Sequence, residues 1–429
     1  MSNTPELLVF HENKSYPMKL FKELFLENNS YEASGIIKSF GNSFCFKVVG
    51  FLLLDDKIIA IFPKGFAFSD YISDDAAMLL KVLFRYRNSR NLEPEEIQML
   101  RGDNVFKNGR LVSAIALLED YQKNGYLTRN QVNRTHNVHG FPDWNRTVKT
   151  CTPLLSHRRP VYVDPVIRSS QTDTSNIITQ IHKVVIGECL SIFSWLFGNS
   201  TDSTPSTMLL SQQEAISMLE IELQNTFVQR EVEVIKLLIQ YLSAKTGAAD
   251  SYTVELLATP FFHNTWEAIC GYVFENQYAI LKGIVPHPQW KNAKVEGNIA
   301  QRPDILYNHN SKLYILDAKY YDYKKNLPGW HDVVKQLFYK FTIEKSMNSQ
   351  FTNHESPHYN SIVNAFVLPE NSDDDMVHLG DIHVENVDEL GDLYVFSINT
   401  RNAMHLYANK KKSDYRNLLE QNMYSISLS

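Results

Sequence analysis

One short segment, with a strand-like run on each side of a polar turn, limits the possible folds of this chain more than any other. The runs cover residues 302–307 and 312–321, and the sequence Asn-His-Asn-Ser lies between them. Two such runs joined by turn-forming residues predict an antiparallel β-hairpin. The hairpin carries charges that buried strands rarely tolerate, namely Asp304 on the first run and Asp317 and Lys319 on the second.

The chemistry of this hairpin depends on which side chains share a face. Because side chains alternate along a strand, Asp317 and Lys319 point to the same side. If all four intervening residues form the turn, Tyr307 pairs with Lys312. Asp304 then becomes a diagonal neighbour of Asp317, with backbones roughly 7–8 Å apart. Two carboxylates at that separation can converge on a hard divalent cation such as Mg²⁺. A cation beside a lysine suits the activation of water against a phosphodiester.

Length and composition indicate an ordinary globular protein with room for two or three domains. The chain has 429 residues, of which 44% are hydrophobic and 21% are charged. Its formal net charge is −6, with 48 acidic and 42 basic residues. Because a purely electrostatic nucleic-acid binder is usually basic, affinity for DNA would have to come from local patches or from a partner.

The spacing of the cysteines and the length of the apolar runs indicate the cellular compartment. The four cysteines lack zinc-type spacing, which is typical of reduced thiols in a cytoplasmic protein. The first residues do not resemble a signal peptide. The most apolar run, 184–197, is too short to span a bilayer and contains Glu188. We therefore expect a cytoplasmic protein that does not associate with membranes.

The fold class expected from the patterns is mixed α/β, or α+β, in three consecutive regions. These are an N-terminal α/β domain for partner or DNA recognition (1–165), a helical region (166–250) and a C-terminal domain that carries the hairpin (251–429). Within the first region, runs 44–54 and 57–63 predict a hairpin, and helices are expected over 74–90, 93–100 and 111–124. In the second, 212–242 reads as one long amphipathic stretch.

Two predicted helices flank the charged hairpin. The first carries an apolar stripe from Trp266 to Phe274, and Glu267 borders that stripe in the first turn. The second spans 330–344 and carries Gln336. With the strands 361–368 and 393–398, the C-terminal region has the order α-β-β-β-α-β, which is typical of metal-dependent nucleases.

Several motifs of the chain together resemble the PD-(D/E)xK nuclease superfamily, and within it the LlaJI and McrC restriction proteins. In the C-terminal region they are Trp266-Glu267, Arg302-Pro303-Asp304, Leu316-Asp317-Ala318-Lys319-Tyr320 and Lys335-Gln336-x-x-Tyr339. In the N-terminal half they are Ile61-Phe62-Pro63-Lys64 and the segment from Asp143 to Thr147. The Gln336–Tyr339 spacing is one residue shorter than the Q-x-x-x-Y spacing of RecB-type enzymes. The resemblance therefore assigns the role of this motif to Gln336.

The resemblance implies a role for each site residue. Asp304 and Asp317 would ligate Mg²⁺, with Mn²⁺ as an alternative, and Glu267 would reach the metal directly or through water. Lys319 would orient or activate the attacking water and offset charge on the phosphate, and Gln336 would support the site from the second helix. A structural interpretation competes with each role, because Asp317 and Lys319 could form a local ion pair and Glu267 could favour a helix N-terminus.

The resemblance also implies partners. These are double-stranded DNA, an McrB-like AAA+ GTPase that moves along DNA, and a cognate DNA methyltransferase of the same restriction system. Lys324 and Lys325, just after the second strand, are candidate contacts to the phosphate backbone. Two alternatives remain open. One is a methylation-dependent McrC-like subunit, and the other is a scaffold or GTPase-activating subunit whose DNA cleavage is secondary.

Overall fold

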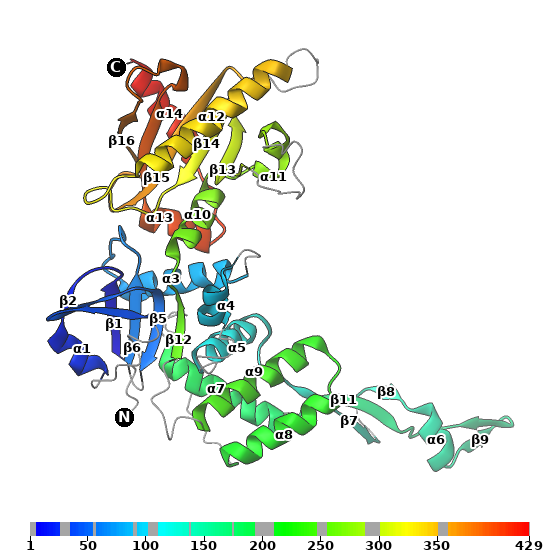
Figure 1. Cartoon of the computed structure of the whole chain (residues 1–429). Helices are drawn as coiled ribbons and strands as arrows, with labels where there is room; N and C mark the ends of the chain where they lie inside the picture. Colours follow the sequence, from blue (N-terminus) through cyan, green and yellow to red (C-terminus); the bar gives the residue numbers. More distant parts are fainter. Residues whose placement is uncertain are drawn as a thin grey trace, which may run out of the picture. The chain divides into compact units, whose positions relative to one another are not determined.

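The structure, a computed structural model, describes residues 6–25, 35–54, 57–88, 92–101, 110–136, 139–173, 176–193, 210–246, 255–287, 301–350 and 359–428. Helices and sheets alternate along the chain, so the predicted mixed α/β class is confirmed (Figure 1). The chain forms two compact units. The middle unit spans residues 107–255, and the two-segment unit combines residues 5–106 with residues 256–429. This division differs from the three consecutive regions expected from the sequence.

A five-stranded mixed sheet forms the C-terminal part of the two-segment unit. Its strand order is β13-β14-β15-β17-β16. The outer pairs β13/β14 and β16/β17 are antiparallel, and the two central pairs are parallel. The strands are β13 (Ile305–His309), β14 (Lys312–Ala318), β15 (Ser361–Glu370), β16 (Met376–Ile382) and β17 (Leu393–Asn399).

Helices surround this sheet and supply its apolar contacts. The long helix α12 (Trp330–Gln350) lies across the strands, where Leu337 packs on Phe366 and Ile343 packs on Leu313 and Ile315. Around the sheet and its ends lie α10 (Phe262–Val273), α11 (Tyr278–Leu281), the 3-10 turns η3 (Lys282–Ile284) and η4 (Asp388–Leu390), α13 (Thr400–Ala408) and α14 (Tyr415–Leu428).

The order before α12 differs from the prediction in one respect. The described residues contain two strands between α10 and α12, whereas the sequence pattern predicted three. Residues 288–300 lie outside the described part of the chain. The two strands that are present are those of the charged hairpin.

The hairpin turn is shorter than expected, and this changes the pairing. Asn310 and Ser311 alone form it, with φ values of 48° and 58°. Two consecutive positive φ values are the signature of a type I′ turn, whose twist matches that of the paired strands. As a result Tyr307 lies opposite Tyr314, not Lys312 as predicted. The two tyrosine rings stack, with centroids 4.7 Å apart and planes 3° from parallel.

The N-terminal segment of the two-segment unit contains two further sheets. One is four-stranded in the order β1-β6-β5-β12, and the other is three-stranded in the order β2-β4-β3. The predicted hairpin covers β5 and β6, but residues 43–46 form a separate strand in the second sheet. The elements are β1 (Glu6–His11), β2 (Tyr16–Pro17), α1 (Met18–Phe25), β3 (Ile37–Phe40), β4 (Ser43–Phe46), β5 (Val49–Leu54), β6 (Lys57–Phe62), α3 (Ile72–Tyr86), α4 (Pro94–Arg101) and β12 (Glu255–Thr259).

Charged and aromatic side chains join the N-terminal segment to the C-terminal part. The Arg85 guanidinium on α3 lies 4.1 Å from the ring centroid of Tyr272 and 4.2 Å from that of Tyr407. The buried carboxylate of Asp75 accepts a hydrogen bond of 2.8 Å from Arg401 on α13. Such cation–π and ion-pair contacts are strong when shielded from water. They explain why segments far apart in sequence belong to one unit.

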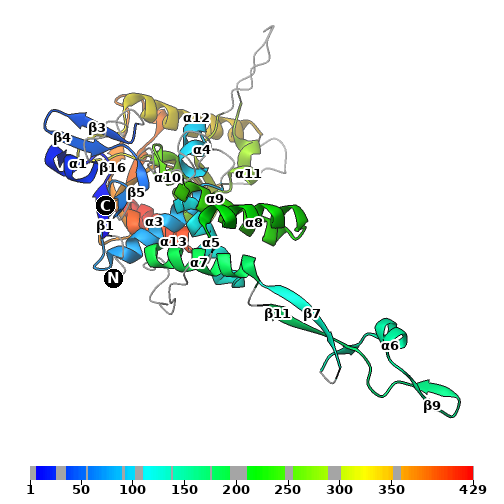
Figure 2. The ribbon, with the colours of Figure 1, turned by 90° about the horizontal axis from the view of Figure 1, so that it is seen from below.

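The middle unit consists of helices and an extended arm. Its helices are α5 (Arg110–Asn124), α7 (Ile177–Phe193), α8 (Gln212–Asn225) and α9 (Gln229–Thr246). The predicted stretch 212–242 is thus two helices, and the region expected to be entirely helical begins with a strand. Figures 1 and 2 show the arm leaving the helices of its unit. The arm comprises β7 (Arg129–Thr135), β8 (Phe141–Pro142), α6 (Trp144–Thr150), β9 (Leu154–Ser156), β10 (Arg159–Val161) and β11 (Ile167–Asp173).

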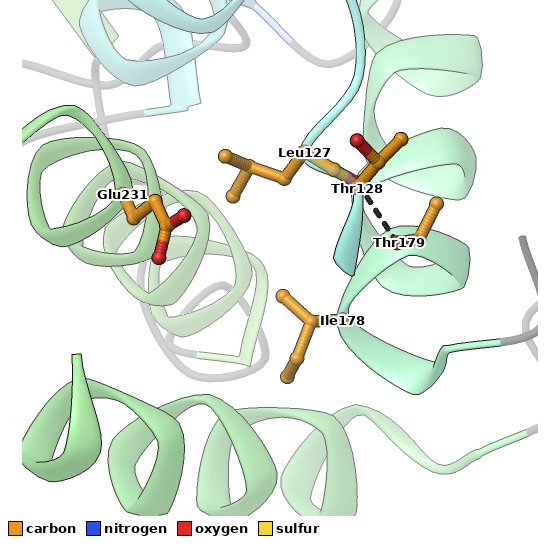
Figure 3. A pocket seen from close by; sticks show the side chains of 5 residues that line it. All are labelled: Leu127, Thr128, Ile178, Thr179 and Glu231. Carbon is orange, nitrogen blue, oxygen red and sulfur yellow. Dashed lines mark hydrogen bonds between the residues drawn. The ribbon is translucent and has the colours of Figure 1, made fainter. Parts of the chain in front are cut away.

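The arm is fixed to its helices just before β7. Thr179 on α7 donates a hydrogen bond of 2.8 Å to the carbonyl of Leu127 (Figure 3). The backbone N–H of Leu127 donates to Nδ1 of His182 at 3.0 Å. Burial lowers the pKa of His182 to about 4, so this histidine is neutral and can accept the bond. None of the helices in the described parts of either unit combines the length and apolarity needed to cross a membrane.

A substitution at Gly50 on β5 tests the close packing of β5 against β12. Its φ is +149°, and an added Cβ would lie 2.2 Å from the carbonyl oxygen of Leu257. We expect Gly50→Ala to lower the free energy of unfolding by about 2 kcal/mol or more, because both the conformation and the space require glycine. Urea denaturation followed by circular dichroism measures this. Gly41→Ala is the control, because Gly41 also has a positive φ but no atom near its Cβ position. Equal losses at the two sites would contradict the expected contact.

Candidate active site

The two hairpin aspartates lie opposite each other. Extending the observed pairing of β13 with β14 by one residue places Asp304 across from Asp317, so the predicted diagonal arrangement is wrong. Oδ2 of Asp304 accepts a hydrogen bond of 3.1 Å from the backbone N–H of Ala318. Asp317 is 1% exposed at the end of β14. The shorter turn therefore brings the carboxylates closer than the sequence suggested.

Asp304 experiences strong electrostatic repulsion. Burial, together with the neighbouring charges of Asp317 and Glu267, raises the pKa of Asp304 to about 7. Burial and a like charge both disfavour the ionised form of a carboxyl group. A cation placed between Asp304 and Asp317 would relieve both effects.

Lys319 lies beside Asp317, as strand alternation requires. Its ammonium is 2.7 Å from Oδ2 of Asp317 and 2.8 Å from Oδ1 of Asp332, which lies at the start of α12. Its backbone N–H donates to the carbonyl of Val367 on β15, which fixes the strand end. Burial alone would lower the pKa of Lys319, but the two carboxylates raise it above its usual value. The two carboxylates thus favour the charged form of Lys319.

Asp317 has unusually few partners for a buried carboxylate. Besides the Lys319 contact, its Oδ1 lies 3.6 Å from the Lys335 ammonium. Each oxygen faces a lysine ammonium, and neither has a backbone donor among the described residues. Buried carboxylates normally make several hydrogen bonds. These oxygens can therefore accept a cation.

Sequence reasoning missed two of these residues. Asp332 had no predicted role, and Lys335 was noted only as part of a motif. The signal was present, because Asp332, Lys335 and Tyr339 follow one another at intervals of three and four, which places them on one face of α12. Tyr339 lies near the hairpin as well, and its hydroxyl donates to the carbonyl of Arg302 at 3.4 Å.

Glu267 is an electrostatic neighbour of both aspartates. It occupies an exposed position on α10. The desolvation of its carboxylate raises its pKa, and the charge of Asp317 adds to this. Within the described ranges no three His, Cys, Asp or Glu side chains approach closely enough to hold one metal ion. The structure thus brings Asp304 and Asp317 together but does not bring Glu267 into the same ligand set.

The residues present fit a magnesium ion. Mg²⁺ is usually held by one or two carboxylates and keeps several waters, so Asp304 and Asp317 suffice as protein ligands. The lysine ammonium groups beside Asp317 show that this buried carboxylate attracts positive charge, and the raised pKa of Asp304 also favours a cation there. Glu267 would then act through water or not at all.

Gln336 supports the sheet and does not face the aspartates. It is fully buried, and its Nε2 donates to the carbonyl of Ile315 at 3.0 Å and to Oδ1 of Asn364 at 2.9 Å. Asn364 donates back to the backbone carbonyl of Gln336 at 3.3 Å. These bonds tie α12 to β14 and β15 two residues before Asp317. They hold the strand that presents the aspartate.

Lys324 and Lys325 lie in the turn after the catalytic strand. Lys324 is 3.4 Å from Glu370, and Lys325 is 2.7 Å from Asp322. Their side chains are 67% and 79% exposed. Because exposed ion pairs contribute little energy, neither lysine is prevented from contacting a phosphate. Their predicted role in DNA binding stays a prediction.

A cleft of about 370 Å³ opens beside the site. Glu267 and Lys319 line it together with residues of the N-terminal segment. The remaining lining residues are Glu12, Asn13, Lys47, Lys64, Pro260, Phe262, His263, Ala318, Tyr320 and Tyr321.

Asp304 makes the stability of the metal-free protein depend on pH. Its carboxyl titrates from 3.8 when unperturbed to about 7 in the folded chain. Between these values the folded state retains a proton that the unfolded state has lost, so stability falls as pH rises through this window. Asp304→Asn removes the charge. We expect it to stabilise the protein by on the order of 2–4 kcal/mol above pH 7 and hardly at all below pH 4.

Urea denaturation in the presence of a chelator, repeated across this pH range, measures the effect. The exposed Asp373→Asn is the matched control. A gain in stability that is the same at every pH would show that ionisation of Asp304 does not destabilise the folded protein.

Comparison with known proteins identifies a matching family and a similar protein. The profile of the LlaJI restriction endonuclease family matches residues 48–398. The type II restriction enzyme BsuMI component YdjA of Bacillus subtilis (strain 168) is 29% identical over 293 residues, which is 63% of this chain and 60% of that protein. The chain thus aligns with less than two thirds of this relative.

Two solved structures are also similar. One is a half-complex from a tetradecameric assembly of Thermococcus gammatolerans McrB AAA+ hexamers with bound McrC. It matches with a TM-score of 0.41 at 13% identity, over 94% of this chain and 98% of the other. The other is the T. gammatolerans McrBC complex, with a TM-score of 0.26 at 14% identity, over 55% and 79% of the two chains. The family match covers most of the chain and confirms the resemblance seen in the motifs. The chain belongs to the LlaJI restriction endonuclease family.

Proposed function

We propose that this protein is a metal-dependent endodeoxyribonuclease that cuts double-stranded DNA as a subunit of a prokaryotic restriction system. The observation that carries this proposal is the position of Asp304 beside the end of β14, where it accepts a hydrogen bond from Ala318 next to Asp317, with the Lys319 ammonium 2.7 Å from Asp317. Two carboxylates for a cation and a fixed positive charge are the groups that phosphodiester hydrolysis requires.

The residues divide the work as follows. Asp304 and Asp317 would hold Mg²⁺, or Mn²⁺, which when bound neutralises phosphate charge and makes water more acidic. Lys319 donates hydrogen bonds to the phosphate as negative charge develops there. Asp332 holds the Lys319 ammonium from the opposite side, at 2.8 Å. Water attacks in line with the departing oxygen, with no covalent intermediate on the protein.

The partners follow from the family and from the charge of the chain. A net charge of −6 suits a subunit that relies on another component for much of its DNA affinity. The relative from B. subtilis is itself named as a component of a restriction enzyme. We therefore expect a McrB-like AAA+ GTPase that moves DNA and a cognate methyltransferase that protects the host, all in the cytoplasm.

Lys319→Met tests the nuclease assignment. The substitution removes the ammonium and keeps an unbranched side chain, so we expect cleavage of plasmid DNA with Mg²⁺ to fall by about 10²-fold or more. Lys345→Met, on the exposed side of α12, is the control for loss of one charge. Initial rates from gel electrophoresis measure both.

The same assay separates the nuclease from a scaffold. Undiminished cleavage by Lys319→Met would refute the proposed site. Lost cleavage with unchanged GTP hydrolysis by the reconstituted complex would support it, and would show that the N-terminal half does not depend on this lysine.

A further inference from the structure

We propose that Lys64, from the N-terminal segment, binds the phosphate backbone of DNA in the cleft that Glu267 and Lys319 also line. The inference rests on the proposed nuclease function and adds a binding residue to it. Lys64 follows β6 and is more than 200 residues away from the hairpin in sequence, yet both line the same cleft.

The backbone at Lys64 is fixed to the catalytic strand. Its N–H donates a hydrogen bond of 3.0 Å to the hydroxyl of Tyr320, the residue directly after Lys319. The next residue, Gly65, has a φ of +73°, and its Cβ position is 3.3 Å from both the carbonyl oxygen of Pro369 and Oγ1 of Thr400. A larger residue would strain the backbone at this positive φ and would require its neighbours to shift. The position of Lys64 is therefore set by the same elements that set the position of Lys319.

The Lys64 side chain is oriented but not neutralised. Its ammonium lies 4.1 Å from the ring centroid of Tyr320, a cation–π distance. It makes no ion pair or hydrogen bond with the described residues. By contrast, Lys319, Lys324 and Lys325 each contact a carboxylate. The Lys64 ammonium is thus fixed in position in the cleft, and its N–H donors are available to a ligand.

The charges around Lys64 suit an anionic strand. Its charged neighbours are Glu12, Asp322, Lys325 and Lys47. Lys47 lines the same cleft and donates to Oδ1 of Asn13 at 2.6 Å. A chain that is acidic overall needs such a local cluster to hold a phosphodiester near its cutting site.

A second explanation for Lys64 is that it merely compensates Glu12. The Glu12 carboxylate is buried, at 8% exposed. It accepts a hydrogen bond from Nδ2 of Asn13 at 3.1 Å. Lys64 is a charged neighbour of Glu12 but lies beyond ion-pair distance among the described contacts. The two explanations predict different behaviour when Glu12 is changed.

Binding of a fluorescent DNA duplex to the full chain, with Ca²⁺ in place of Mg²⁺, tests the proposal. Lys64→Met keeps the stem over Tyr320 and removes the charge. We expect it to weaken binding about 5- to 10-fold and to reduce the slope of log K against log salt by about 0.9, the value for one lost phosphate contact. Lys64→Arg should restore most of the affinity. Lys38→Met, at an exposed site on β3, should bind as the unmodified chain does.

The double variant Lys64→Met with Glu12→Gln separates the two explanations. If Lys64 binds phosphate, the loss of affinity persists when Glu12 is neutral. Recovery of affinity in the double variant would overturn the proposal, as would unchanged affinity and salt slope in Lys64→Met. If Lys64→Met does not fold, as judged by circular dichroism, Lys64→Gln takes its place and faces the same criteria.

These outcomes are distinct from failure of the nuclease assignment. DNA binding in Ca²⁺ is measured without any cleavage. An unmodified chain that binds DNA through Lys64 but cuts none with Mg²⁺ or Mn²⁺ would refute the proposed function and leave the binding site intact. A chain that cuts DNA with the same KM and kcat after Lys64→Met would refute the binding site alone.

Discussion

The site depends on the position of two acidic side chains directly across an antiparallel pair. Asp304 and Asp317 would repel each other strongly in a buried hairpin. Lys319 and Lys335 reduce this cost, because each places an ammonium next to Asp317. Asp332 in turn holds Lys319. The hairpin, the start of α12 and the end of β14 therefore form a single electrostatic arrangement, in which every charge is positioned by another.

The sequence could predict the parts of this arrangement that follow from local geometry. Strand alternation is enough to place Asp317 and Lys319 on one face, and the flanking apolar stripes indicate α10 and α12. The register was not predictable in the same way. Asn310 and Ser311 form a two-residue turn without the glycine that usually marks one, so a longer turn was the reasonable interpretation. An error in the assumed length of the turn changes which residue lies opposite Asp304.

Contacts between distant segments could not be predicted from the sequence, for a different reason. The interaction of Arg85 with Tyr272 and Tyr407 leaves no periodic signal in any single segment. The same is true of Lys64 and Tyr320, which are 256 positions apart. Sequence patterns report which face of an element is apolar but not which element covers it. The three-region division failed at this point, because the first segment completes the unit that carries the hairpin.

The strand β12 shows that the middle unit is an insertion. The chain leaves the two-segment unit after residue 106 and re-enters it through β12, which pairs with β5 and leads directly into α10. A fragment that begins near residue 251 would therefore keep every motif of a nuclease while presenting β12 as an unpaired edge. Such a fragment would also lack the wall of the cleft that Lys47 and Lys64 provide. The unit that carries the candidate site is therefore discontinuous in sequence.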